Sequence, residues 1–299
     1  MIAKSRVKFV KPATKQRNKM VNGLSTISLW VLGISTLFLI GALLFIILSK
    51  GLSLITFDFL IKLPEEIDVG GGIGPVLFNS FYVLVLSMMF SIPLGLGAGI
   101  YLAEFAPNNR WTETIRLAVE CLASVPSIVF GLFGMFLFVE YFQIGLTILG
   151  ASITLALLNL PVLTRVTEIS IKSVPDSLRE ASQALGATKF QTIRTVVIPA
   201  ALSGILTGIS LVACRAYGES AVIILTAGTS TSGVMWDWNL FSPGETLAVH
   251  LWYVQSEAIV EDAKEIADKS AAVLVFVVLS ISLLLRLPIW LLDRKAKLH

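Results

Sequence analysis

Six long runs of apolar residues constrain this chain of 299 residues more than any other feature. They cover approximately residues 24–49, 74–103, 118–139, 146–164, 200–227 and 271–292. A helix needs about 20 predominantly apolar residues to cross a bilayer. Apolar residues make up 55% of the chain and charged residues 14%, whereas a soluble domain carries about 25% charged residues. The sequence therefore predicts an all-α integral membrane protein with six transmembrane helices and excludes a wholly soluble enzyme.

The polar segments between these runs define the predicted organisation. The first apolar run is too long for a signal peptide and is interpreted as a retained helix. The predicted parts are a basic tail over 1–23, the first transmembrane helix over 24–49, a transmembrane domain over 74–293 with polar segments at 165–199 and 228–270, and a short tail over 294–299.

The distribution of charge predicts the orientation of the chain in its membrane. The tail 1–23 carries seven basic residues and no acid, and the segment 165–199 carries five basic residues. The segment 228–270 has two basic residues and is rich in carboxylates. Because cytoplasmic flanks of membrane helices are enriched in Lys and Arg, we expect both termini and 165–199 to be cytoplasmic. The chain is then a multi-pass protein of the cytoplasmic (inner) membrane, surrounded by lipid.

The sequence offers little that could perform chemistry. Cys121 and Cys214 both lie in apolar runs, where we expect small buried side chains rather than a disulfide. His250 and His299 are far apart, so no metal site is predicted. The chain lacks the Gly-x-x-x-x-Gly-Lys-Ser/Thr motif that binds ATP phosphates, and it lacks the His-Glu-x-x-His and Gly-x-Ser-x-Gly motifs. We therefore expect no cofactor, no metal, no catalytic residue and no nucleic-acid partner.

A short amphipathic helix is predicted within the segment 165–199. Asp176 or Ser177 can serve as its N-cap, and Gly186 can end it in a left-handed conformation. One apolar stripe runs along it, formed by Leu178, Ala181, Ala184 and Leu185. Such a helix can lie on the bilayer surface or dock onto a cytoplasmic partner, and the pattern alone favours neither. A second short helix is expected over 189–197, before Pro199.

The same segment resembles the EAA loop of ABC-importer permeases. Glu180-Ala181-Ser182 is followed by three residues, Gly186, nine residues and an aliphatic run that ends in Pro199. The family pattern has Ala in place of Ser182. In the family this helix couples the permease to its ATPase. The resemblance thus implies an ATPase-coupling role for Asp176, Leu178, Glu180, Ala181, Leu185 and Gly186.

Three runs make the resemblance more specific. Residues 160–168, 174–181 and 215–220 are similar to the A-type permease subunits of phosphate importers, which have the type I (MetI-like) architecture. The resemblance implies a function in ATP-driven import of inorganic phosphate. It also implies three partners: a related C-type permease that completes a heterodimer, a dimer of ATPase subunits, and an extracytoplasmic phosphate-binding protein.

An anionic substrate is also expected from the residues themselves. Arg215 and Glu219 lie in the fifth apolar run, where facing lipid would be costly, so we expect them to face the substrate pathway or another helix. Four residues apart on one helix, they can form an ion pair, which can equally be purely structural. A guanidinium group suits phosphate because its planar fork matches two oxygens. Arg165 can supply a second cation or act as a snorkelling anchor, and Glu120 is a further intramembrane carboxylate.

Other interpretations remain at this point. The aromatic residues near Trp236 and Trp238 suit an extracytoplasmic docking surface or an aromatic belt at the membrane interface. The substrate can be another oxyanion, such as sulfate, molybdate or phosphonate. An integral membrane enzyme would need a reactive set at membrane depth, for which only Arg215 and Glu219 are available. A self-sufficient channel would have no use for an ATPase-docking loop.

Overall fold

The computed structural model describes residues 12–65, 70–257 and 260–296, and side chains over 21–65, 70–257 and 260–287. Residues 1–11 of the expected basic tail and 297–299 of the expected C-terminal tail lie outside the described residues. The chain divides into two compact units, Met1–Ser49 and Lys50–His299.

The described part of the first unit belongs to a single long helix. Helix α1 (Pro12–Gly51) contains a candidate membrane span that begins at Val21. Its apolar side chains are exposed, and Phe38 is among the most exposed of them. A helix satisfies all of its backbone hydrogen bonds internally, so such a surface is compatible with lipid. By length and composition, this helix can cross a membrane.

Two long parallel helices form the centre of the second unit. Helix α3 (Gly74–Ile100) continues through a π-helical turn η2 (Tyr101–Phe105), and helix α6 (Ile148–Lys172) packs beside it. Gly95 permits close contact, because a Cβ atom there would lie 2.9 Å from the side chain of Leu163. Small residues of this kind allow membrane helices to approach closely.

The two central helices carry a proline at the same level. Pro93 in α3 and Pro161 in α6 each lie two residues before the contact of Gly95 with Leu163. A proline inside a helix removes one backbone hydrogen bond and favours a kink. Ser91 and Asn159 precede these prolines by two residues; both are buried, and their side chains have no hydrogen-bond partner among the described residues.

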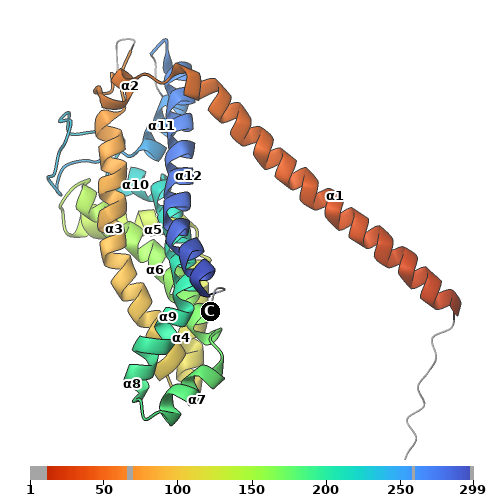
Figure 1. Cartoon of the computed structure of the whole chain (residues 1–299). Helices are drawn as coiled ribbons and strands as arrows, with labels where there is room; N and C mark the ends of the chain where they lie inside the picture. Colours follow the sequence, from red (N-terminus) through yellow and green to blue (C-terminus); the bar gives the residue numbers. More distant parts are fainter. Residues whose placement is uncertain (1–11, 66–69, 258–259, 297–299) are drawn as a thin grey trace, which may run out of the picture. The chain divides into compact units, whose positions relative to one another are not determined.

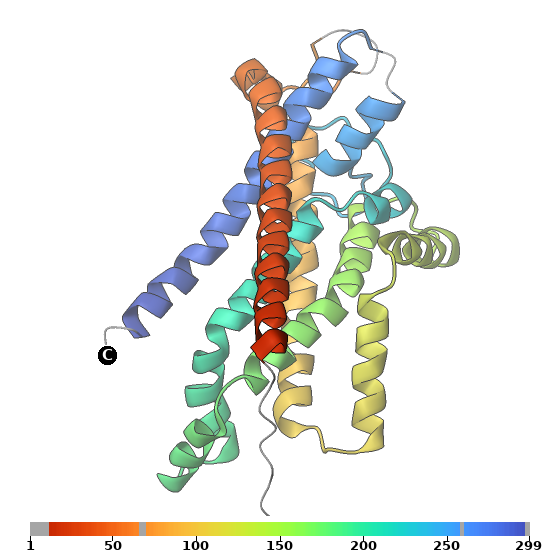
Figure 2. The ribbon, with the colours of Figure 1, turned by 90° about the vertical axis from the view of Figure 1, so that its right-hand side faces the viewer.

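The third expected span is broken. Helix α4 (Arg110–Ala123) and helix α5 (Ser127–Gly134), which continues through the π-helical turn η3 (Met135–Tyr141), are bent by 94° at the break. Figure 2 shows α5 lying nearly perpendicular to α4. The apolar run over 118–139 was expected to be interrupted at Pro126, and the break lies there, because Pro126 ends one helix direction and begins the next.

Other helix boundaries also differ from the expected ones. The fourth span was expected to end near 164, but α6 continues to Lys172. The short helix expected over 189–197 is not separate, because α8 (Lys189–Thr192) and a π-helical turn η4 (Ile193–Val197) continue directly into helix α9 (Ile198–Tyr217). The fifth span was expected to reach 227, yet α9 ends at Tyr217.

The remaining elements are the last long helix, α12 (Ala263–Ala296), and the short helices between the long ones. The short helices are η1 (Leu52–Leu54), α2 (Phe57–Ile61), α7 (Asp176–Ala184), α10 (Ala221–Thr226) and α11 (Leu247–Ser256). Within the second unit α7 and α8 lie together at one end, and α2 and α11 lie at the opposite end (Figure 1). We call these the α7 end and the α11 end.

The long helices account for the predicted membrane architecture. Among the described residues, five helices are long and apolar enough to cross a membrane, and the bent pair of α4 and α5 provides a sixth if it counts as one span. The described part of the chain contains no strand, only an isolated bridge between Thr231 and Gly244. The all-α membrane fold predicted from the sequence is thus confirmed.

Candidate functional site

Helix α7 follows α6 and precedes α8 in the chain. Pro175 is its N-cap residue and no side chain caps it, so the expectation of Asp176 or Ser177 as N-cap is wrong. Asp176 instead lies in the first turn, where a carboxylate favours the positive end of the helix dipole. Gly186 has φ +86°, which confirms the predicted left-handed residue after the helix.

The apolar stripe of α7 is left uncovered by the chain itself. Leu178 is 42% exposed and Leu185 is 90% exposed. Glu180 and Ala181 are exposed as well. The opposite face turns towards the protein, where the hydroxyl groups of Ser182 and Thr192 lie 3.0 Å apart. This contact gives a structural role to Ser182, the position at which the sequence departs from the EAA pattern.

A buried carboxylate links α6 to α4 near the α7 end. The side chain of Glu168 is only 1% exposed, and its oxygens lie 2.6 Å from Lys172 Nζ, 2.7 Å from Arg116 Nε and 3.1 Å from Arg165 Nη1. Arg116 also donates to the carbonyl oxygen of Leu102. Sequence reasoning missed this cluster, although Arg165, Glu168 and Lys172 are spaced to share one helix face.

Arg165 lies between two carboxylates. Its Nη2 atom is 2.5 Å from Glu120 Oε1, which provides the partner that the sequence could not name for Glu120. Its Nη1 atom contacts Glu168. The side chain of Arg165 is 35% exposed. A free snorkelling anchor would show no such pairing, so this arginine joins α4 to α6.

The structure does not pair Arg215 with Glu219. Helix α9 ends at Tyr217 and Gly218 follows as its C-cap, so Glu219 lies beyond the helix. The expected helical face shared by the two residues is therefore absent. No ion pair between them occurs among the described side chains. Arg215 lies in the last turn of α9, and both residues are half-buried.

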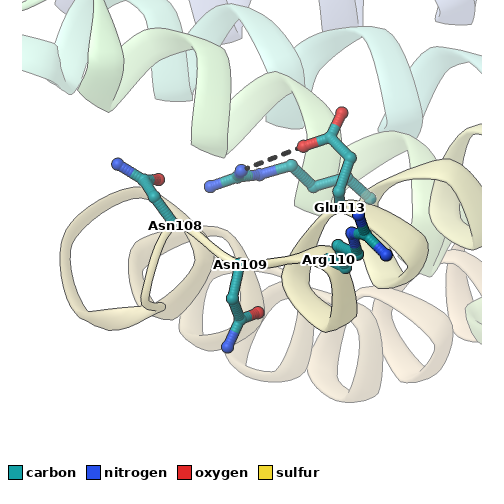
Figure 3. A pocket seen from close by; sticks show the side chains of 5 residues that line it. Asn108, Asn109, Arg110 and Glu113 are labelled. Atoms are coloured by element: carbon teal, nitrogen blue, oxygen red, sulfur yellow. Dashed lines mark ion pairs between the residues drawn. The ribbon is translucent and has the colours of Figure 1, made fainter.

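A polar hollow of about 490 Å³ lies at the start of α4. Figure 3 shows Asn108 and Asn109 on one side and Glu113 on the other, and the dashed line joins Glu113 to Arg116, 3.5 Å away. Asn109 uses its side-chain oxygen to cap α4 through the amide of Thr112. The hollow is open and is lined by both basic and acidic side chains. Because Arg116 lines it and also pairs with Glu168, we interpret it as the solvated edge of the Glu168 cluster.

The α11 end contains an aromatic cluster. Trp238 packs edge-on against Phe78 and Tyr82, and Tyr82 donates a hydrogen bond to the carbonyl oxygen of Trp238. Trp236 and Trp238 remain more than half exposed. Hydrogen bonds from Ser242 and from the backbone of Asn239 hold the pKa of Asp237 below its usual range. The loop is thus folded against α3 and presents aromatic surface.

The cysteines form no disulfide, and the internal histidine is buried. Cys121 and Cys214 are both free. Cys121 is exposed on α4, so the expectation that it is buried is wrong. His250 is buried and its Nδ1 atom lies 3.2 Å from Glu245 Oε1. No group of three or more His, Cys, Asp or Glu residues in the described ranges is arranged to hold a metal ion.

Comparison with known proteins adds a family and several relatives. Residues 95–297 match the family described as binding-protein-dependent transport system inner membrane component. The chain is 45% identical over 258 residues to a probable ABC transporter permease protein, YqgI, of Bacillus subtilis, covering 83% of this chain and 87% of that protein. It is 33% identical over 273 residues to the phosphate transport system permease protein PstA of Haemophilus influenzae, covering 91% and 94%.

Solved structures show the same fold. A chain of the methionine ABC transporter MetNI in an inward-facing conformation matches with a TM-score of 0.58 and 21% identity, covering 73% of this chain and 94% of that chain. A chain of a bacterial ABC transporter involved in the import of the acidic polysaccharide alginate matches with a TM-score of 0.61 and 13% identity, covering 94% and 99%.

Proposed function

We propose a function in phosphate import for this chain, which belongs to the family of binding-protein-dependent transport system inner membrane components. As a permease subunit of an ABC importer, it would form half of the translocation pathway for inorganic phosphate. Phosphate transport permeases of Haemophilus influenzae and Yersinia pestis, 33% and 36% identical to this chain, support this substrate. The name of the Bacillus relative states no substrate.

The exposed stripe of α7 carries the proposal that an ATPase subunit docks there. Helix α6 has 25 residues, and at 1.5 Å per residue it is about 37 Å long. This exceeds the hydrocarbon thickness of about 30 Å, and α7 follows the end of α6 (Figure 1). A helix held beyond the hydrocarbon cannot bury Leu178 and Leu185 in lipid, which favours a protein partner over the bilayer surface.

Replacing Gly186 by valine is expected to stop uptake and to release the ATPase from the purified complex. The residue has φ +86°, which a β-branched residue adopts poorly. A Cβ atom there would meet nothing within 4 Å, so the effect comes from backbone conformation rather than from a clash. The measurement is ATPase retention in a pull-down together with phosphate uptake.

Two matched variants control this test. Gly186→Asn should retain docking because asparagine tolerates the left-handed region. Gly145→Val introduces the same strain at φ +74°, also with open space around the Cβ position, but away from α7. Normal ATPase retention and full uptake in Gly186→Val would contradict the docking role of α7.

The proposed complex contains three further kinds of subunit. Two ATPase subunits would dock on α7 of this chain and on its equivalent in a related C-type permease, and the pathway would lie between the two permeases. An extracytoplasmic phosphate-binding protein would deliver the substrate at the α11 end, where Trp236 and Trp238 offer aromatic contact surface. Hydrolysis of ATP would take place in the ATPase subunits, and this chain would serve transport without a reaction of its own.

The proposed orientation places the α7 end in the cytoplasm. The basic residues of 165–199 and the acidic character of 228–270 support it. In a background with Cys121 and Cys214 replaced by alanine, a cysteine at exposed Ser177 should react with a membrane-impermeant thiol reagent only from the cytoplasmic side. A cysteine at Val234, which is 57% exposed, should react only from outside. The reverse labelling pattern would overturn the orientation.

Phosphate specificity is tested in the assembled transporter. We expect inorganic phosphate, delivered by its binding protein, to stimulate ATP hydrolysis by the reconstituted complex more than sulfate or molybdate at equal concentration. Stimulation by sulfate or molybdate alone would assign the chain to an importer of another oxyanion and leave its role as a permease intact.

A further inference from the structure

Glu104 occupies a buried junction at the end of α3. It lies in the π-helical turn η2, and its side chain is 9% exposed. Its Oε1 atom accepts two hydrogen bonds from Arg179 of α7, at 3.0 Å from Nε and 2.8 Å from Nη2. A guanidinium group that donates twice to one carboxylate is held in position as well as attracted.

Arg179 fixes α7 to two helices at once. Besides contacting Glu104, it donates to the carbonyl oxygen of Ile171 at 2.9 Å and to that of Val174. These carbonyl groups lie at the end of α6 and just after it. Asp176 adds a contact at 3.1 Å, but that carboxylate is 88% exposed and contributes little. The side chain of Arg179 is 17% exposed, so its contacts form on the protein side of α7.

Helix α8, which follows Gly186, also contacts Glu104. Lys189 of α8 donates through Nζ to the carbonyl oxygen of Glu104, and its Nζ atom lies 5.1 Å from the centroid of the Phe105 ring. Glu104 thus binds α7 through its side chain and α8 through its backbone. Both helices that flank Gly186 are therefore attached to the end of α3, while the apolar stripe of α7 stays free.

The α3 end is suited to transmit a movement. Its last turn is π-helical, an arrangement often found at functional sites, and Pro93 lies further along the same helix. A displacement of α7 would act on α3 through the Arg179–Glu104 pair, because α7 contains no buried residue that could anchor it by apolar packing. Hydrogen-bond and ion-pair contacts between rigid helices are among the connections that carry energetic coupling between two sites.

We propose that Glu104 is a positioning residue that couples movement of the ATPase-docking helix α7 to the transmembrane helix α3. This inference rests on the proposed docking of an ATPase at α7. The proposal assigns two separate roles to α7. Its exposed face binds the ATPase, and the contact of its opposite face with Glu104 transmits movement of the ATPase to the transmembrane helices.

The test uses Glu104→Ala in the complete importer. The ATPase subunits should co-purify in normal amounts and hydrolyse ATP at the basal rate. Stimulation of hydrolysis by the phosphate-loaded binding protein, and phosphate transported per ATP, should both fall by at least about fivefold, within the usual range of coupling between sites. Glu104→Gln keeps an oxygen acceptor for Arg179 and should restore part of both quantities. Glu113→Ala, a carboxylate 78% exposed on α4, should leave them unchanged.

Two results would overturn the inference. Loss of the ATPase from the Glu104→Ala complex would show that Glu104 merely supports the docking surface, and the proposed docking on α7 would stand. Wild-type transport per ATP in Glu104→Ala would show that the coupling takes another route. Failure of the docking proposal is recognised separately, because only then does Gly186→Val retain both the ATPase and full uptake.

Discussion

Replacing Glu168 by alanine is expected to lower the stability of the permease strongly. Removing one member of a buried ion pair typically costs about 3–5 kcal/mol because the other charge is left uncompensated. Without Glu168, the charge of Arg116, whose side chain is only 14% exposed, would lose its buried partner. Arg165 and Lys172 are 35% and 44% exposed, so they can turn towards water. We therefore expect a loss near the lower end of this range, about 3 kcal/mol.

The measurement is the midpoint of thermal unfolding of the purified complex in detergent. Glu113→Ala is the matched control, because Glu113 contacts the same Arg116 at 3.5 Å but is 78% exposed. Exposed ion pairs contribute little, so this variant should unfold close to the wild type. Equal midpoints for Glu168→Ala and the wild type would show that α4 and α6 are held together by apolar packing and that the cluster adds nothing.

The long helices could be predicted from the sequence because lipid leaves few alternatives. Any apolar run long enough to cross the bilayer must satisfy its backbone internally, and a helix does so. Hydropathy does not, however, determine where a helix ends. Helix α6 continues through Arg165, Glu168 and Lys172. Charged residues at the end of an apolar run are typical of a loop, but these three form ion pairs along one face of the helix. Their spacing is a signal that could have extended the predicted helix.

The opposite error occurred in the fifth apolar run. Hydropathy stays high past Gly218, so the run suggested one helix containing both Arg215 and Glu219. A glycine followed by polar residues is a common signal for the end of a helix, and α9 does end there. The expected ion pair was thus built on a helical spacing that the chain does not adopt.

The site at the α7 end was predictable only in its local part. The left-handed Gly186 and the exposed stripe of α7 follow from neighbouring residues. The Arg179–Glu104 pair joins residues 75 positions apart, and nothing in the local pattern identifies either as the partner of the other. Such contacts depend on the packing of α3 beside α6, which requires the tertiary structure.

Replacing Arg215 by lysine is expected to reduce phosphate uptake severely while the complex still assembles. Arg215 lies in the last turn of α9, where any cation is favoured by the negative end of the helix dipole. Lysine keeps this charge but loses the planar fork that matches two phosphate oxygens. Loss of one charged hydrogen bond, about 1.5–3 kcal/mol, corresponds to a decrease in uptake of about tenfold or more at subsaturating phosphate.

The lysine variant separates a substrate role from a structural one because the structure gives Arg215 no ion pair with Glu219 to disrupt. Uptake is measured together with recovery of all subunits, and Arg110→Lys, at an exposed arginine of α4, controls for the substitution itself. If Arg215→Lys assembles and transports phosphate at the wild-type rate, the guanidinium fork is unnecessary and Arg215 serves only the end of α9. If uptake falls while assembly and basal ATP hydrolysis persist, the geometry of the arginine, rather than its charge, is what the phosphate pathway uses.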